Sequence, residues 1–313
     1  MILIMGVAGA GKSYFINQLA GKQVVEEGTD LETCTQSCSL VPVDIGPSQI
    51  LVVDVPDFDD TIRADSEILQ EIARLLAAQY QLGVNLKGII YIHRITDKRY
   101  SASALKNLEM VKKICGDAAL KNVLLVTSRW AEIPEDVGLN HERELKENFW
   151  AYMIARGSNM CRFRSDRNSA LSVVSQLLVK DTIVLGLQRQ LVDQEKPLNE
   201  TEAGSYLNDD LERLKMAYQL ELASLDKKLE IFESDRAPTR QIQHDWHKEQ
   251  DRLKQAQDQQ QSLQRHVGSE VRGEIDSAKR RKSALGQALA FVPAAINMLG
   301  LFVGIPSIAT DNL

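Results

Sequence analysis

The clearest chemistry in the chain belongs to a short glycine-rich segment near its start. Residues 6–13 read Gly-Val-Ala-Gly-Ala-Gly-Lys-Ser and match the spacing G-x-x-x-x-G-K-S. In this pattern backbone N–H groups surround phosphate oxygens, the lysine ammonium reaches the outer phosphates and the serine hydroxyl binds Mg²⁺. Lys12 is also the candidate catalytic cation, because phosphoryl transfer depends on neutralising phosphate charge. The residues expected to bind a nucleoside phosphate here are Gly6, Gly9, Ala10, Gly11, Lys12, Ser13 and Tyr14.

The residues on both sides of this loop fit the same interpretation. Residues 1–5 read Met-Ile-Leu-Ile-Met, a continuous apolar run typical of a central parallel strand that is buried on both faces. Residues 14–19 have the pattern of a helix, whose amino-terminal dipole favours an anion. The sequence therefore predicts a strand, a phosphate-binding loop and a helix in this order.

A second apolar run ends in an acid. Residues 50–53 read Ile-Leu-Val-Val, and Asp54 follows them directly. An aspartate that ends a strand after a phosphate-binding loop is typical of a carboxylate that binds Mg²⁺ directly or through water. We predict that Asp54 and Ser13 contribute to one magnesium site.

A third metal ligand is expected from the polar segment 27–38. Its composition suits a loop that becomes ordered around a γ-phosphate and its Mg²⁺. The segment contains Thr29, Thr33 and Thr35. We favour Thr35 as the metal ligand and as a catalytic residue, with the other two threonines as alternatives.

The surrounding elements must hold these side chains at one place. Strand-like apolar runs and helical patterns alternate up to about residue 190. Strands are expected at residues 2–5, 50–55, 88–92, 123–127 and 160–164, and helices at 64–81 and 102–114. This alternation predicts an α/β fold over residues 1–190, with the doubly wound, mostly parallel sheet of a P-loop NTPase. Ligands of such sheets bind at the carboxyl ends of the strands.

Composition limits the partners and the location. The 313-residue chain has a net charge of -6 and a pI near 5.5, which argues against nucleic-acid binding. Of its four cysteines only Cys34 and Cys38 are close in sequence, so we expect reduced thiols rather than a zinc site. Because the first strand begins at Met1, no secretory signal is expected, and we predict a cytoplasmic protein.

Composition changes after Pro197, and residues 198–282 are predicted to form a helical or coiled-coil region. An apolar stripe at near-heptad spacing supports this. Its members are Leu207, Leu211, Leu214, Tyr218, Leu222, Leu225, Leu229 and Phe232. We expect Pro238 to interrupt the stripe. Three arrangements remain open: a long helix on the sheet domain, a hairpin that closes on itself, and a coiled coil with a protein partner.

The last part of the chain, residues 283–313, is an apolar tail. The basic run 279–282 precedes residues 284–306, which carry no charge and are about long enough to cross a bilayer. Gln287, Asn297 and two prolines weaken this hydropathy. A membrane surface is therefore one candidate partner, and an apolar tail folded back on the protein is the alternative.

Several longer runs carry a family resemblance over about residues 1–185. Residues 54–61, Asp-Val-Pro-Asp-Phe-Asp-Asp-Thr, resemble the D-T-P-G-F-D-D-T segment of known GTPases. Residues 88–97, 103–108 and 115–118 are more distinctive. Together they resemble fungal G-domain-containing P-loop GTPases, related to septins and to the plant-type immunity-associated (AIG1-like) GTPases.

The resemblance implies a G domain that binds GTP or GDP with Mg²⁺ and hydrolyses GTP slowly. Relatives of this class often pair across the nucleotide face, which makes a homodimer a candidate assembly. The Asp54 segment is not followed by a glutamine that would orient water, which also implies slow turnover. His93 and Arg94 lie at a predicted strand end, where they are candidates for a role toward a dimer partner.

Two positions depart from the family pattern. Asp57 stands where relatives carry a glycine whose N–H binds the γ-phosphate, so a carboxylate that faces the phosphates would weaken GTP binding. Ala131 stands where relatives carry the aspartate that recognises guanine, with Glu132 beside it. Purine selectivity is thus less secure than phosphate binding. The candidate base-contacting residues in this segment are Ser128, Arg129 and Trp130.

Three functions follow from these observations. The first is a nucleotide-controlled GTPase that switches protein or membrane partners. The second, suggested by Asp57 and Ala131, is a degenerate G domain that acts as a scaffold. The third is an ATP-using P-loop enzyme, for which we find no acceptor site in the sequence.

Overall fold

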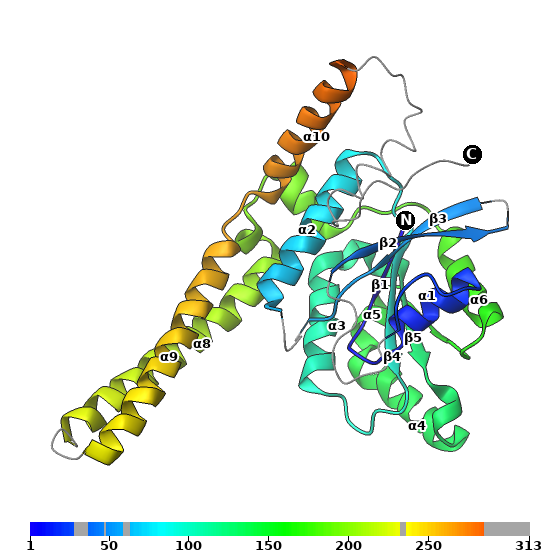
Figure 1. The fold of residues 1–313 in the computed structure, drawn as a ribbon. Helices are drawn as coiled ribbons and strands as arrows, with labels where there is room; N and C mark the ends of the chain where they lie inside the picture. Colours follow the sequence, from blue (N-terminus) through cyan, green and yellow to red (C-terminus); the bar gives the residue numbers. More distant parts are fainter. Residues whose placement is uncertain (28–36, 47, 59–62, 232–235, 285–313) are drawn as a thin grey trace.

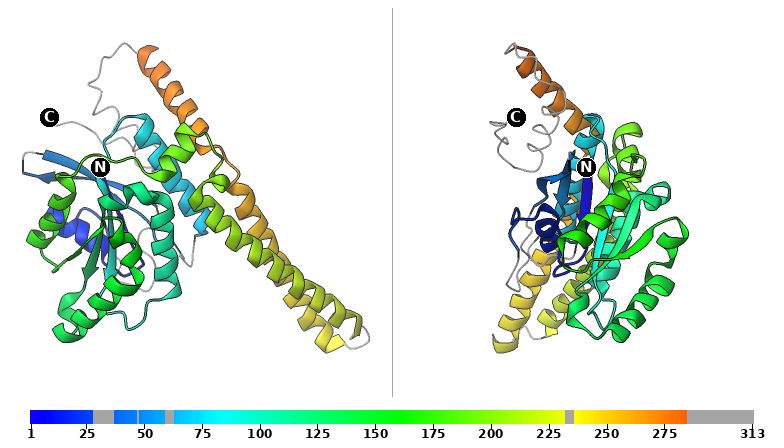
Figure 2. Two further views of the ribbon diagram at one scale, coloured as in Figure 1. Left: turned by 180° about the vertical axis from the view of Figure 1, so that it is seen from behind. Right: turned by 90° about the vertical axis from the view of Figure 1, so that its right-hand side faces the viewer.

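The computed structural model describes residues 1–27, 37–46, 48–58, 63–231 and 236–284 (Figure 1). One part of it is a sheet covered by helices. The other is a helical arm that projects from one side of the sheet, as Figure 1 and the left view of Figure 2 show.

The sheet is mixed and mostly parallel. Its strands are β1 (Ile2–Met5), β2 (Ser39–Ile45), β3 (Ser48–Asp54), β4 (Gly88–Arg94), β5 (Val123–Ser128) and β6 (Asn159–Arg162). Their order is β2-β3-β1-β4-β5-β6, and only the β2–β3 pair among these is antiparallel. The five strands predicted from apolar runs are confirmed, with boundaries that shift by at most two residues.

The edge strand β2 was missed by the sequence analysis. Val41 and Val43 are buried while Pro42 and Asp44 are exposed, so the strand alternates and lacks a continuous apolar run. Pro42 cannot donate a backbone hydrogen bond, which is tolerated at the edge of a sheet. Gly46, with φ 59°, forms the tight turn back into β3.

Helices cover both faces of the sheet. The helices of the sheet domain are α1 (Lys12–Ala20), α2 (Asp65–Gln81), α3 (Ala102–Cys115), α4 (Glu135–Glu144), α5 (Ala151–Ala155) and α6 (Arg167–Leu178). Strand β1 illustrates the layering, since its side chains alternate between two cores. Ile2 and Ile4 pack toward α1 and α6, whereas Leu3 packs toward α2 and α3. The predicted doubly wound α/β arrangement is confirmed.

The described part of the arm consists of three helices. They are α8 (Glu202–Ile231), α9 (Arg236–Ser262) and α10 (Val267–Ala284). Helices α8 and α9 lie side by side as an antiparallel hairpin, and α10 runs along α2 (Figures 1 and 2). Of the three arrangements left open, the hairpin is the one found. Pro238 lies in the first turn of α9, where a missing N–H costs little.

The arm shares a hydrophobic core with the sheet domain. Leu207, Leu263 and Val271 belong to the same buried cluster as the α2 face of the sheet. A short helix α7 (Gly186–Gln188) and a π-helical turn (Arg189–Asp193) connect the two parts. Gln188 of this connection donates a hydrogen bond of 3.0 Å to the backbone carbonyl of Leu76 in α2. The arm is therefore anchored directly on α2.

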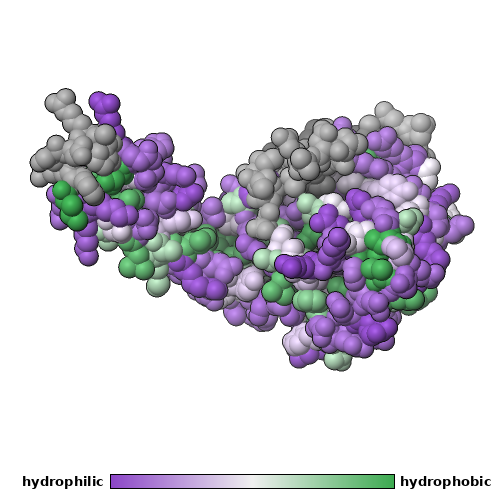
Figure 3. All heavy atoms as spheres, turned by 90° about the horizontal axis from the view of Figure 1, so that it is seen from below, coloured by the Kyte–Doolittle hydropathy of each residue, from purple (hydrophilic) through white to green (hydrophobic). Residues whose placement is uncertain are grey.

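The predicted apolar stripe is only partly buried within the hairpin. Leu207, Leu211 and Leu225 are buried, but Leu214 is 45% exposed. Phe232 lies outside the described residues. Met216, Leu220 and Ile231 are also exposed on α8, and Figure 3 shows hydrophobic surface along the arm within a mostly hydrophilic exterior. A coiled coil with a separate partner stays a prediction.

The described residues, which end at Ala284, include no helix that is both long and apolar enough to span a bilayer. Apart from its first two residues, the apolar tail predicted for residues 283–313 lies outside them.

Two glycines of α10 provide a matched test of how the arm is anchored. A Cβ at Gly268 would lie 2.0 Å from the backbone oxygen of Leu191, whereas a Cβ at Gly273 would meet no atom within 4 Å. We predict that Gly268→Ala lowers the free energy of unfolding by about 1–3 kcal/mol through overpacking. Gly273→Ala should instead raise it by up to about 1 kcal/mol, because alanine favours helices. Urea unfolding of both variants measures this, and equal effects would contradict the close packing.

Candidate phosphate-binding site

The glycine-rich loop lies between β1 and α1, at the carboxyl end of the central strand. Gly6 passes so close to β4 that a Cβ would lie 2.1 Å from the backbone oxygen of Ile92. Gly11 adopts φ 89° and ends the loop as the N-cap residue of α1. Within the described residues, no side chain caps this end of α1, and its first turn contains no acid. The loop therefore presents backbone donors and the positive end of a helix, an environment that suits a phosphate.

Lys12 folds back across the loop. Its Nζ atom donates a hydrogen bond of 2.9 Å to the backbone oxygen of Gly6 and lies 3.6 Å from Oδ1 of Asp57. The side chains of Lys12 and Asp57 are each only 6% exposed. The Asp57 carboxylate thus faces the Lys12 ammonium and not solvent.

Ser13 and Asp54 come together as predicted for a magnesium site. The Ser13 hydroxyl donates a hydrogen bond of 3.1 Å to Oδ2 of Asp54, which is almost fully buried at the end of β3. A hydroxyl and a carboxylate are oxygen ligands of the kind that Mg²⁺ prefers, so the pair fits the ion. The third predicted ligand, Thr35, lies outside the described residues.

The segment after β5 reaches the loop through two side chains. The Ser128 hydroxyl donates a hydrogen bond of 2.7 Å to the backbone oxygen of Ala10. Arg129 donates from Nε to the backbone oxygen of Gly9 at 3.0 Å. Arg129 has φ 61°, an unfavourable value for a residue with a side chain, and such backbone strain is typical of functional sites.

Both neighbours of Ala131 contact other side chains of the same domain. The Arg129 guanidinium holds the Glu132 carboxylate through two contacts of 3.0 and 3.2 Å. Trp130 turns toward α4, where its ring packs on Gly138 and under the Arg162 guanidinium at 4.1 Å. The segment predicted to contact the base thus lies beside the loop, whereas the pairing of Glu132 with Arg129 and the packing of Trp130 against α4 could not be read from the sequence.

The spacing of residues in the sequence did not predict the contacts of Tyr14 and Arg94. The Tyr14 hydroxyl donates a hydrogen bond of 3.0 Å to the backbone oxygen of Ser165, so it ties α1 to the segment after β6. The Arg94 guanidinium forms an ion pair with Asp97 and lies beside Gly9 of the same chain. Arg94 therefore places positive charge beside the glycine-rich loop of its own chain. The sequence feature that indicated this site was the position of Arg94 at the end of a predicted strand.

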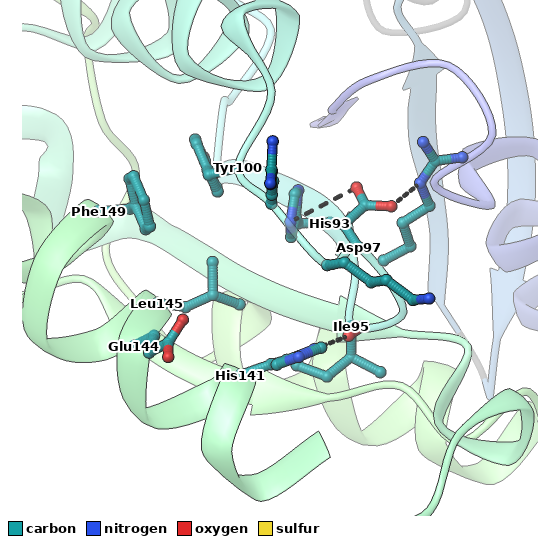
Figure 4. Close-up of a pocket in the computed structure, with 11 residues that line it drawn as sticks. His93, Ile95, Asp97, Tyr100, His141, Glu144, Leu145 and Phe149 are labelled. Atoms are coloured by element: carbon teal, nitrogen blue, oxygen red, sulfur yellow. Dashed lines mark hydrogen bonds and ion pairs between the residues drawn. The ribbon is translucent and has the colours of Figure 1, made fainter. Parts of the chain in front are cut away.

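His93 is part of a packed cluster next to the loop (Figure 4). Its ring is 2% exposed and lies 4.9 Å from the Tyr100 ring, which stacks in turn on Phe149. Nε2 of His93 faces Oδ2 of Asp97 at 3.8 Å. The adjoining cavity measures about 30 Å³, the room of about one water molecule. Burial lowers the pKa of His93, the Asp97 carboxylate opposes this shift and the Arg94 guanidinium adds to it, so that the pKa falls to about 4. His93 is therefore a neutral packing residue.

The lowered pKa makes a prediction for stability. The folded pKa of about 4 lies below the usual value of 6.5, so the unfolded chain binds more protons between these pH values. The contribution of His93 to stability is complete above pH 6.5 and is lost as the pH falls toward 4. We expect wild type to lose about 2 kcal/mol more than His93→Phe between pH 7.5 and pH 5.

Urea unfolding at the two pH values measures this difference. The control is His247→Gln, which changes an exposed histidine of α9 and should follow wild type. An identical loss in wild type and His93→Phe would contradict the assignment.

Comparison with known proteins matches the first part of the chain. Two curated relatives are GTPase IMAP family member 8 from Rattus norvegicus and from Mus musculus. The rat protein is 27% identical over 183 residues, which cover 56% of this chain and 25% of that protein. The mouse protein is 26% identical over 164 residues, which cover 51% and 22%. The chain thus spans about a quarter of the length of these relatives.

Solved structures give a partial likeness. Toc33 from Arabidopsis thaliana in complex with Mg²⁺ and GMPPNP has a TM-score of 0.46 and 16% identity, and the alignment covers 58% of this chain and 85% of Toc33. A dimerization-deficient mutant of the same Toc33 has a TM-score of 0.47 and 15% identity, with 59% and 86% covered.

A family model matches the first part of the chain. Residues 1–177, more than half of the 313, match the AIG1 family. The AIG1-like part of the resemblance is thereby confirmed, whereas its fungal and septin parts stay predictions. The chain belongs to the AIG1 family.

Proposed function

We propose that this protein binds guanine nucleotides with Mg²⁺ and hydrolyses GTP slowly. The observation that carries the proposal is the arrangement around the glycine-rich loop. The buried Lys12 ammonium lies on the loop, and the Ser13–Asp54 pair sits at its end. Ser128 and Arg129 support the loop from β5. Membership of the AIG1 family and the relatives named GTPases favour guanine nucleotides over other phosphate ligands.

Each residue has a proposed role. The backbone N–H groups of residues 9–14 and the Lys12 ammonium hold phosphate oxygens. Ser13 and Asp54, with Thr35 as the third ligand, hold Mg²⁺. When bound, the ion neutralises charge on the phosphates. Arg94 and Arg129 add positive potential beside the loop. Slow hydrolysis follows because the segment after Asp54 offers no glutamine to orient water.

We further propose that the nucleotide controls assembly through the arm. Helix α2 begins eight residues after Asp57, and α10 is bound along it. Arg74 of α2 contacts Glu274 of α10 at 2.9 Å, and Gln81 donates a hydrogen bond of 3.0 Å to the backbone oxygen of Gly268. A displacement of the Asp57 segment would therefore reach the arm through a single helix.

The partners and the location are part of the same proposal. The candidates are a second copy of this chain, a coiled-coil protein that uses the exposed apolar face of α8, and a membrane surface that receives the tail. We propose a cytoplasmic location. We propose a three-part division at residues 1–190, 198–282 and 283–313, although α10 continues across the last boundary to Ala284.

A degenerate nucleotide-binding scaffold is the second candidate. Two observations favour it: a carboxylate already faces Lys12, and the position that would recognise guanine is Ala131. In a scaffold, removal of Lys12 would leave folding and assembly unchanged.

Lys12→Ala tests whether the glycine-rich loop is the nucleotide site. We predict that the affinity for GDP in the presence of Mg²⁺ falls by about tenfold to a hundredfold, because charge-assisted contacts with the phosphates are lost. Lys22→Ala, which removes an exposed lysine just after α1, should bind as wild type does. Calorimetric titration measures the affinities, and circular dichroism checks the fold. No binding by wild type would end the proposal, and unchanged binding by Lys12→Ala would exclude this site.

Ala131→Asp tests where the base lies. A carboxylate at this position should accept hydrogen bonds from guanine, so the preference for GDP over ADP should rise by about tenfold or more. The Ala131→Asn variant is the matched control, because it has the same size but lacks the charge. Competition of both nucleotides against a fluorescent GDP analogue measures the preference. If Ala131→Asp leaves it unchanged, the base does not contact this segment.

A further inference from the structure

The Asp57 carboxylate occupies a position that the chemistry of the site does not require. It lies 3.6 Å from the Lys12 ammonium, and the two side chains are almost fully buried. A buried lysine needs a counter-charge, which a bound nucleotide would otherwise supply. In the structure, an internal carboxylate supplies it.

Asp57 is held in place by its neighbours. Val55, two residues before it, donates a backbone hydrogen bond of 3.2 Å to Ile4 of the central strand. Phe58, directly after it, is fully buried. Asn107 of α3 accepts from the Phe58 N–H at 3.1 Å and donates to the Phe58 carbonyl at 2.7 Å. The backbone on both sides of Asp57 is therefore held in place, and the carboxylate that it carries is almost fully buried.

The position of Asp57 affects the nucleotide's phosphates unequally. The loop and the start of α1 enclose the inner phosphates, while the lysine also reaches the terminal phosphate of a triphosphate. Asp57 belongs to the separate segment after β3 and contacts the lysine at its charged end. Because the Lys12 ammonium has three donors, it can contact the outer phosphate of a diphosphate and still keep Gly6 and Asp57 as partners. A third phosphate must share the lysine with a carboxylate of like charge.

We propose that Asp57 competes with the third phosphate for Lys12 and makes this site selective for nucleoside diphosphates over triphosphates. The inference rests on the proposed function, since it concerns the same loop. It assigns a specificity role to a residue that departs from the glycine of relatives, and it implies that the diphosphate-bound form is the resting state of the protein.

The test compares GDP with GMPPNP, a triphosphate analogue that resists hydrolysis, each titrated calorimetrically into the full chain with Mg²⁺. Wild type should bind GDP at least about tenfold more tightly than GMPPNP. Asp57→Asn keeps the shape and removes the charge, and Asp57→Gly removes the side chain. In both variants the ratio of the GMPPNP and GDP dissociation constants should fall by about tenfold or more.

The matched control is Asp44→Asn, which removes the same charge from an exposed position on β2 and should leave the ratio at its wild-type value. Thermal unfolding without nucleotide checks that each variant folds, and the two substitutions at Asp57 keep the test valid if one of them does not. A ratio that stays at the wild-type value in the folded Asp57 variants would overturn the inference alone. A wild type that binds neither nucleotide would overturn the proposed function and the inference with it.

Discussion

The site depends on how closely the chain approaches β4 as it leaves β1. Gly6 leaves the central strand with its backbone against Ile92, at a distance that leaves no room for a side chain. This contact turns the loop over the carboxyl ends of the neighbouring strands. Asp54 from β3, Arg94 from β4 and Ser128 from β5 consequently meet at one place. The fold contributes to function by converging strand ends, as parallel sheets generally do.

Positive and negative side chains are paired where these strand ends meet. An acidic chain with a net charge of -6 gathers Lys12, Arg94 and Arg129 around one loop. Each of these cations already contacts an acid of the same chain: Lys12 contacts Asp57, Arg94 contacts Asp97 and Arg129 contacts Glu132. A bound polyphosphate would compete with these carboxylates for the three cations. We expect the strongest competition from Asp57, because the Lys12–Asp57 pair is the most buried and its charges are least screened by solvent.

The arm gives the proposed nucleotide control a route beyond the sheet domain. It is anchored on α2, the helix that follows the Asp57 segment, by a shared hydrophobic core and by polar contacts such as Arg74–Glu274. A helix packed on both the sheet and the arm is a rigid connection, since close-packed interiors transmit small shifts. The exposed leucines of α8 lie beyond this anchor, which leaves them available to a partner.

Patterns among residues close together in the sequence determined the glycine-rich loop and most of the strands of this protein. The loop spacing, the apolar strands and the acid at Asp54 could be recognised in the sequence because they depend on residues close together in the chain. The strand β2, the orientation of Asp57 and the hairpin of the arm were decided by tertiary structure. Asp57 and Lys12 are far apart in sequence, and no local propensity tells a carboxylate which buried cation it will face. An apolar stripe likewise specifies burial but not its partner, because the hydrophobic effect has no direction of its own.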